Sequence, residues 1–212
     1  MITPVAIPSE IDQWPLSGEI EQRIVASGER IEAFQDRWDR PQIEQFVAAD
    51  FRHLYQSLNW IKKTQPLIGN RFLEWGCGFA VVASIASHLG FDVIGIESEQ
   101  DLLRQGELTV QQWNVPVELV HGNFLPRGSE SLAEDSSLPS LGHPVPPAYE
   151  TLGLDLDDFA LIYAYPWPGE DDFHEAVFDQ YAATGAMLLL FCGPNQIRLW
   201  RKEQTRPRRP VR

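Results

Sequence analysis

The sequence contains few of the features that mark a membrane protein or a secreted protein. Its 212 residues include only two cysteines, and no apolar run approaches the length needed to span a bilayer. No basic segment followed by an apolar stretch stands at the start, as a secretory signal would require. Cys77 and Cys192 lack the spacing of metal ligands or of a disulfide framework, so both are interpreted as small buried residues. We therefore expect a cytoplasmic protein without a membrane partner and without a metal.

Basic residues are also scarce. The formal net charge is −13, and nucleic-acid binding depends on Lys and Arg side chains that neutralise phosphates. The composition thus weighs against a nucleic-acid partner. An exception is the stretch from Arg198 to Arg212, which holds seven basic residues and one acid. Its end, residues 204–212, is interpreted as a solvated basic tail, with contact to an acidic partner as the alternative.

The length fits one large domain with a substantial core. We interpret residues 1–66 as an N-terminal arm followed by two helices, and residues 67–203 as a nucleotide-binding domain. The arm, residues 1–17, shows neither helical nor strand periodicity. Ser17 is suited to cap a first helix that Pro41 interrupts.

Further helices and strands follow from apolar periodicity. A second amphipathic helix is expected from about Gln42 to Pro66. Residues 98–110 are expected to form a helix with Leu102, Leu103 and Leu108 facing inward. Strands are expected at residues 117–120, 159–165, 186–191 and 197–202.

The most informative stretch is residues 72–80. A buried strand leads through Glu74 into a turn that contains Gly76 and Gly78, and an apolar helix follows. Glycines let the backbone come close to a ligand, and the start of the helix offers free N–H groups. The next strand ends in Glu97, twenty-one residues after Gly76, a spacing that suits a carboxylate that binds a ribose.

Two nucleotide-binding patterns compete for this stretch. The dinucleotide pattern G-x-G-x-x-G/A needs a small residue where this chain has Val81. The pattern Glu74-x-Gly76-x-Gly78-x-Ala80, followed by Glu97, instead resembles the first two motifs of the class I S-adenosylmethionine-dependent methyltransferases. The chain departs from that family at Ala80, where a third glycine is common. The resemblance covers about residues 72–191.

The resemblance implies a fold, a cofactor and a set of binding residues. The fold is α/β, a doubly wound and mostly parallel sheet, here preceded by two helices. The complete family sheet has seven strands and a closing hairpin, and only twenty residues follow Cys192, so we expect a trimmed C-terminal end. The cofactor is S-adenosylmethionine: Glu74, Gly76, Cys77 and Gly78 would hold its methionine end, and Glu97 its ribose hydroxyls.

The segment after the third strand resembles the family's adenine-binding loop. Asn123 is the candidate for the adenine amino group, and Phe124 for packing on the ring. Because Asn after Gly is also a common turn pair, a purely structural role stays open. Residues 126–147 are rich in Ser, Pro, Gly and acids, and are expected to form a mobile loop that is either a lid or a disordered insertion.

Aromatic residues end the fourth strand, where open α/β sheets bind ligands and methyltransferases bind the methyl acceptor. Tyr163 is assigned to the cofactor, and Tyr165 and Trp167 to catalysis, because ring faces can stabilise a sulfonium or a cationic acceptor. Methyltransferases of nucleobase amines often carry Asp/Asn-Pro-Pro-aromatic here. This chain has Tyr165-Pro166-Trp167-Pro168, so methylation of a nucleobase amine is not expected.

Several acids follow the aromatic residues. If the acceptor must lose a proton, Glu170 is the first candidate base, with Asp171 and His174 as further candidates. Acids in the first turn of a helix are also favoured by the helix dipole alone. A hard cation needs oxygen ligands from several segments, so no metal site is expected.

Three functions stay open from the sequence. The chain is a methyltransferase for a small molecule, a methyltransferase for a protein side chain such as lysine, or a non-catalytic module that binds S-adenosylmethionine or another nucleotide. The acidic composition mildly favours basic acceptors. The N-terminal helices either shape the pocket or simply cover the sheet. The oligomeric state is not indicated.

Overall fold

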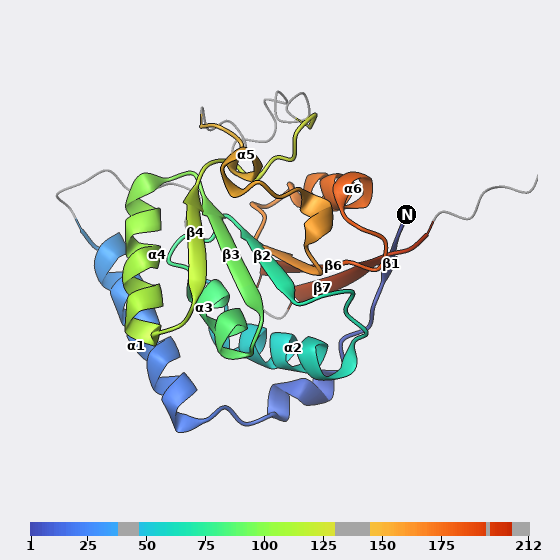
Figure 1. The fold of residues 1–212 in the computed structure, drawn as a ribbon. Coiled ribbons are helices and arrows are strands. Elements are labelled where there is room, and N and C mark those ends of the chain that lie inside the picture. The colour runs from blue at the N-terminus through green and yellow to red at the C-terminus, as the bar shows by residue number, and fades with distance from the viewer. Residues whose placement is uncertain (38–46, 130–144, 194–195, 205–212) are drawn as a thin grey trace, which may run out of the picture.

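A seven-stranded sheet forms the centre of the protein (Figure 1). The computed structural model describes residues 1–37, 47–129, 145–193 and 196–204. The strand order is β1-β7-β6-β5-β2-β3-β4, with β2 to β6 mutually parallel and β7 antiparallel to β6. The predicted doubly wound, mostly parallel sheet is therefore confirmed. The strands are β1 (Ile2–Pro4), β2 (Arg71–Trp75), β3 (Asp92–Glu97), β4 (Val117–His121), β5 (Leu161–Ala164), β6 (Met187–Gly193) and β7 (Gln196–Lys202).

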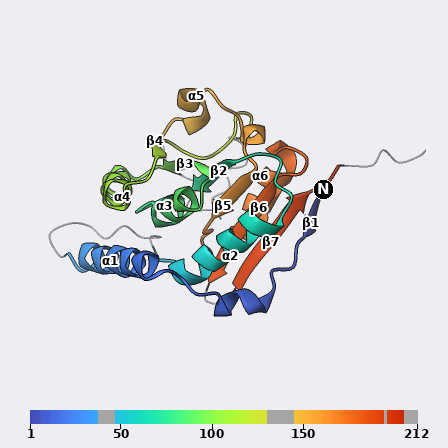
Figure 2. The same ribbon diagram turned by 60° about the horizontal axis from the view of Figure 1, so that its bottom comes forward.

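Helices cover both faces of the sheet (Figure 2). Helices α1 to α4 pack on one face, and α5 and α6 on the other. The helices are α1 (Gly18–Gln35), α2 (Phe51–Thr64), α3 (Val81–His88), α4 (Gln100–Trp113), α5 (Ala148–Leu152) and α6 (Asp171–Tyr181), with short 3-10 turns at Ser9–Gln13 and Leu156–Asp158. In the part of the chain that the structure describes, no helix has both the length and the apolar character needed to cross a membrane.

Polar side chains fix the starts of the two N-terminal helices. The Ser17 hydroxyl accepts the N–H of Ile20 at 3.3 Å, which confirms the predicted cap of α1. The Asp50 carboxylate accepts the N–H of His53 at 3.0 Å and caps α2. The prediction placed residues 47–50 inside the second helix, which is wrong, because this cap holds Asp50 in an extended conformation.

The first strand comes from the segment in which the sequence shows no strand periodicity. Ile2–Pro4 pairs antiparallel with β7, and the Val5 N–H extends the pairing by donating to Leu199 O at 2.8 Å. The N-terminal residues thus supply the seventh strand, in place of a strand from the C-terminal end. Proline has no N–H for a second neighbour, so Pro4 is tolerated at the edge of the sheet.

Other predictions need smaller corrections. Leu102 and Leu103 are buried on α4 as expected, but Leu108 is exposed, because it lies on the solvent face of the helix. Helix α6 begins at Asp171, and the acids Asp171 and Asp172 lie in its first turn, where the helix dipole favours them. Large parts of the expected 126–147 loop and of the basic tail lie outside the described residues.

The strand register brings the first candidate side chains to one face of the sheet. Glu74 of β2 is paired with Tyr163 of β5 on one side and with Gly95 of β3 on the other. Neighbouring residues in register point to the same face, and side chains along a strand alternate. Glu74, Tyr163 and Glu97 therefore all face the α3 side, while Trp75 faces the α5 and α6 side.

Candidate functional site

The glycine-rich turn stands at the carboxyl end of β2. Gly76, Gly78 and Ala80 have φ values of +68°, +52° and +53°, all in the left-handed region. Glycine adopts this conformation without strain, whereas Ala80 carries a cost of about 1–2 kcal/mol. The Cys77 N–H donates to Ile96 O at 2.9 Å, and the Ala80 N–H donates to Cys77 O at 2.6 Å. The turn therefore folds back over β3 before α3 begins.

Two glycines that the sequence analysis did not single out make room for this turn. A Cβ atom on Gly95 would lie 3.0 Å from both the Cβ and the Sγ of Cys77, and 2.8 Å from a methyl group of Leu119. A Cβ atom on Gly106 of α4 would lie 3.0 Å from the carbonyl oxygen of Gly78. A glycine inside a strand and a glycine inside a helix were the available signals, because both weaken their element unless another group approaches closely.

Glu74 is a buried acid at the start of the turn. Its side chain is 3 % exposed, and its Oε2 accepts the N–H of Ala83 in the first turn of α3 at 2.7 Å. Burial raises the pKa of Glu74 well above its usual value, the Ala83 bond acts in the opposite direction, and the neighbouring Glu97 raises it further. No basic side chain pairs with Glu74 among the described residues, so the site suits a cationic group.

Glu97 binds the turn itself. Its Oε2 accepts the Gly78 N–H at 2.6 Å, and its Oε1 accepts the Glu99 N–H at 2.9 Å. Burial raises the pKa of Glu97, and its bonds to backbone N–H groups oppose that shift. The carboxylate thus ties the glycine turn to the end of β3, which the sequence did not predict. The contact of Glu97 with a ribose stays a prediction.

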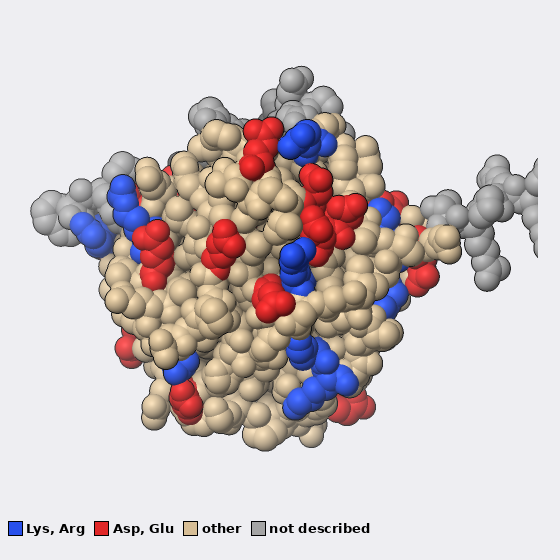
Figure 3. All heavy atoms as spheres, in the orientation of Figure 1, with Lys and Arg blue, Asp and Glu red and all other residues tan. Residues whose placement is uncertain are grey.

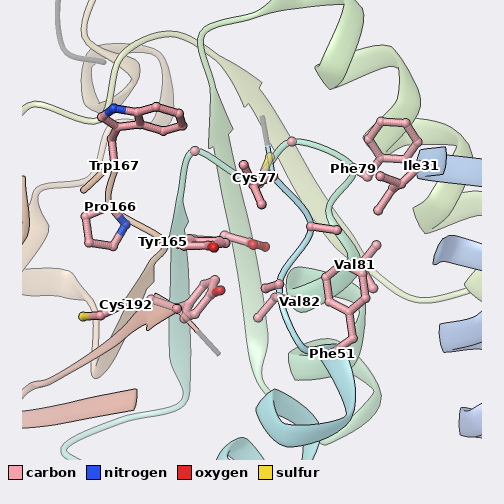
Figure 4. A pocket seen from close by; sticks show the side chains of 18 of the residues that line it. Ile31, Phe51, Cys77, Phe79, Val81, Val82, Tyr165, Pro166, Trp167 and Cys192 are labelled. Carbon is pink, nitrogen blue, oxygen red and sulfur yellow. The ribbon is translucent and has the colours of Figure 1, made fainter. Parts of the chain in front are cut away.

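A cavity of about 390 Å³ opens beside the turn (Figure 4). Tyr165, Trp167 and Cys192 lie on one side of it, Phe51 and Phe79 lie on the other, and the glycine turn lies between them. The structure therefore brings together seven of the predicted site residues. These are Glu74, Gly76, Cys77, Gly78, Tyr163, Tyr165 and Trp167.

Aromatic packing holds the strand side of the cavity. The Tyr165 ring meets Phe191 edge to face, with 4.8 Å between the ring centroids. Burial raises the pKa of the Tyr163 phenol well above its usual value, and the Glu74 carboxyl beside it adds to this shift. Burial also raises the pKa of Tyr165. Both phenols therefore stay protonated at neutral pH and present hydrogen-bond donors.

Asn123 and Phe124 do not line the cavity. The Asn123 amide donates to Val145 O at 2.6 Å, and its carbonyl oxygen accepts the Leu125 N–H at 3.0 Å. Phe124 stacks on Trp75, with 5.0 Å between the ring centroids, on the opposite face of β2 from Glu74. The Asn123 amide is thus hydrogen-bonded within its own loop. The adenine-binding roles of both residues stay predictions.

The three candidate bases also lie away from the cavity wall. Glu170 is 1 % exposed, and His174 Nδ1 lies 2.7 Å from the Glu170 carbonyl oxygen. Burial lowers the pKa of His174. Asp171 forms an ion pair with Arg198, which also binds Glu175. Asp171 and Glu175 thus join α6 to β7 through their ion pairs with Arg198. A catalytic role for Glu170 stays a prediction.

The cavity has a second wall, which the N-terminal helices provide, as one of the two alternatives from the sequence expected. Ile31 of α1, residues 47–49 and Phe51 at the start of α2 line it. The N-terminal helices therefore shape the cavity as well as cover the sheet. The amphipathic spacing of α1 signalled one buried face, but not the group against which that face packs.

Comparison of the sequence with known proteins finds similarity over part of the chain. No family model matches the sequence. A Ubiquinone biosynthesis O-methyltransferase of Acinetobacter baumannii (strain AYE) is 38% identical over 72 residues, which are 32% of this chain and 30% of that protein. The chain thus spans under a third of the length of the curated relatives that it matches.

Solved structures resemble most of the chain. Cofactor-bound Rv0187 from MTB has a TM-score of 0.51 at 16% identity, with 88% of this chain and 73% of that chain covered. An rRNA methyltransferase of T. thermophilus, solved with AdoMet and guanosine, has a TM-score of 0.51 at 12% identity, with 76% of this chain and 44% of that chain covered. The chain therefore has the fold of the class I S-adenosylmethionine-dependent methyltransferases, as the residues of the glycine turn indicated.

Proposed function

We propose that this protein is an S-adenosylmethionine-dependent methyltransferase. The observation that carries the proposal is the cavity at the carboxyl ends of β2 and β5, where a buried acid, a left-handed glycine turn and an aromatic wall meet. The 72-residue match to an O-methyltransferase, at 38% identity, and the AdoMet-bound structural neighbour support the same activity.

The residues present fit the cofactor. Glu74 is an acid without a basic partner among the described residues, so it is placed to bind the cofactor's ammonium group. The left-handed turns at Gly76 and Gly78 let the backbone approach the methionine part closely. When bound, the cofactor supplies a methyl group that its positive sulfur has already activated.

The chain's own contribution is then alignment and shelter. Tyr165 and Trp167 present ring faces on one side of the cavity, and such faces stabilise positive charge. Phe51 and Phe79 oppose them and exclude water. Holding two reactants in line replaces an encounter in solution, and this contributes most of what such a transfer needs.

The surface charge bears on the acceptor. Figure 3 shows Lys and Arg interspersed with Asp and Glu on one face of the molecule, and the net charge is −13. Phosphate backbones bind to clustered positive charge. We therefore propose that the acceptor is a small molecule or a protein side chain, and not a nucleic acid.

A titration with S-adenosylhomocysteine tests the proposal. Trp167 lies on the cavity wall, and Trp75 ends the strand that leads into the turn, so binding should change the tryptophan fluorescence. Glu74→Gln should weaken binding about tenfold, since one charge-assisted contact is lost. Glu107→Gln, at an exposed acid of α4, is the matched control and should bind as the unaltered protein does.

Methyl transfer itself needs a second measurement. Labelled S-adenosylmethionine is incubated with the protein and a lysate, and the protein fraction is separated from small molecules. Label in either fraction supports a methyltransferase. Binding of S-adenosylhomocysteine without label in either fraction would instead favour a non-catalytic module.

A further inference from the structure

We propose that the methyl acceptor is a compact, mainly apolar molecule that enters the cavity without a negative charge. The inference rests on the proposed function and names the acceptor class for the same cavity. It follows from the chemistry of the wall and from the positions of the nearest positive charges.

The cavity wall is apolar over most of its surface. Large rings come from both sides, Tyr165 and Trp167 from the strand side and Phe51 and Phe79 from the helix side. The volume of about 390 Å³ lies in the range of pockets for small ligands. A wall of this kind favours an acceptor with a ring or an aliphatic body, because apolar contact provides most of its binding free energy.

The charge of the wall is of one sign. Glu74 carries its only carboxyl group among the described residues, and these residues include no Lys, Arg or His on the wall. Glu97, which binds the back of the turn, adds a second carboxyl nearby. A carboxylate or phosphate on the acceptor would lose its water shell here without gaining a basic side chain as a partner, and such burial is unfavourable.

The positive charges close to the wall are committed to other contacts. Arg198, behind Cys192, donates to the Cys192 sulfur at 3.1 and 3.3 Å and forms ion pairs with Asp171 and Glu175. The Arg198 guanidinium is thus engaged by these three residues. On the opposite side of the cavity, Arg30 contacts Phe79 of the wall.

Arg30 is held against α4. Its guanidinium lies 5.4 Å from the centre of the Phe79 ring and donates to Thr109, Gln105 and Gln112 at 3.0 to 3.2 Å. The Phe79 ring thus lines the cavity and also contacts Arg30 of α1. Arg30 and Arg198 are therefore both engaged in other contacts and are not available to pair with an anionic acceptor.

Exposed apolar side chains also stand at the mouth of the cavity. Val47 is 52% exposed and Trp167 is 37% exposed, and both line the cavity. An apolar molecule gains contact with both residues as it enters. An anion gains nothing at this rim.

A matched pair of compounds tests the proposal. Methyl 6-hydroxy-2-naphthoate and 6-hydroxy-2-naphthoate share one ring system and one hydroxyl group, and differ in that a neutral methyl ester replaces the negative carboxylate. Their binding is measured by calorimetry with the protein saturated with S-adenosylhomocysteine. The ester should bind at least tenfold more tightly than the carboxylate.

Two variants at the rim sharpen the test without disturbing the core. Val47→Lys places a cation at the mouth, and Val47→Gln is the matched neutral control at the same exposed position. Val47→Lys should narrow the preference for the ester by a factor of three or more, and Val47→Gln should leave the preference unchanged.

Equal binding of the two compounds, tighter binding of the carboxylate, or binding of neither compound would each overturn the inference. S-adenosylhomocysteine binding is measured first, on its own. Its absence refutes the proposed function, whereas its presence together with any of the three outcomes above refutes only the acceptor class.

Discussion

Replacing Gly95 with alanine tests whether the sheet positions the glycine turn. The new Cβ would lie 3.0 Å from the Cβ and Sγ of Cys77 and 2.8 Å from a Leu119 methyl group. The methyl group stands at the end of a flexible side chain and can rotate away. The Cβ of Cys77 cannot, because the Cys77 N–H is bound to Ile96 O at 2.9 Å. The turn must therefore move.

Two opposing effects set the size of the change. Overpacking a well-packed site by one methyl group costs about 1–3 kcal/mol. Replacing glycine with alanine stabilises by about 0.4–1 kcal/mol, because the unfolded chain loses freedom. The midpoints of these two ranges give a fall of about 1.3 kcal/mol in the free energy of unfolding of Gly95→Ala, and its affinity for S-adenosylhomocysteine should fall as well.

Urea unfolding measures the first quantity, and tryptophan fluorescence measures the second. Gly28→Ala is the matched control, since no atom lies within 4 Å of the Cβ that it would add to α1. It should raise the free energy of unfolding by about 0.5–1 kcal/mol, because alanine favours a helix. Cys77→Gly in the Gly95→Ala background should recover part of the loss. If Gly95→Ala is as stable as Gly28→Ala, the close approach of the turn to β3 is not what requires a glycine there.

Three further predictions concern the acid, the aromatic wall and the edge of the sheet. Burial raises the pKa of Glu74, so the folded protein keeps the Glu74 carboxyl proton to a higher pH than the unfolded chain does. The stability that this protonated carboxyl contributes is therefore lost as the pH rises from about 4.3 through the raised pKa. Glu74→Gln should thus be more stable than the unaltered protein at pH 8 but not at pH 4 in thermal unfolding, and equal differences at both pH values would contradict this. Trp167→Ala should reduce methyl transfer at least tenfold while changing the free energy of unfolding by under about 1 kcal/mol, since the side chain is 37% exposed; an unchanged rate would exclude Trp167 from the acceptor site. Deleting residues 1–5 removes the strand pairing of β1 with β7 and should lower the free energy of unfolding by about 2–4 kcal/mol, at about 1 kcal/mol for each hydrogen bond; an unchanged urea midpoint would show that β1 is dispensable.

The sequence predicted those parts of the fold that local signals determine. Glu74, Gly76 and Gly78 lie within five residues, and their spacing alone indicated the strand, the turn and the helix start. The same is true of the Ser17 cap. Such features depend on backbone conformation and on neighbours in the chain, which a pattern can report.

The parts that the sequence did not predict depend on distant contacts. β1 has three residues, one of them proline, and its only signal is its pairing with β7, about two hundred residues away. Gly95 and Gly106 leave room for Cys77 and for the Gly78 carbonyl oxygen, and a sequence pattern does not show such contacts between distant residues. Asn123 was matched to a loop by its residue type, whereas the contacts of its amide with Val145 and Leu125 depend on how the chain returns to that loop.

The pairing of β1 with β7 also means that the two ends of the described chain meet. The Glu203 N–H donates to the carbonyl oxygen of Met1 at 2.9 Å, and the Met1 amino group forms an ion pair with Asp179. A short peptide linker is therefore enough to join residue 203 to residue 1, and new termini can be opened at the exposed Gly153 without cutting any strand. A circularly permuted protein of this design would keep all seven strands in register and carry its ends beside α5, which frees the edge at β1 from any fused tag.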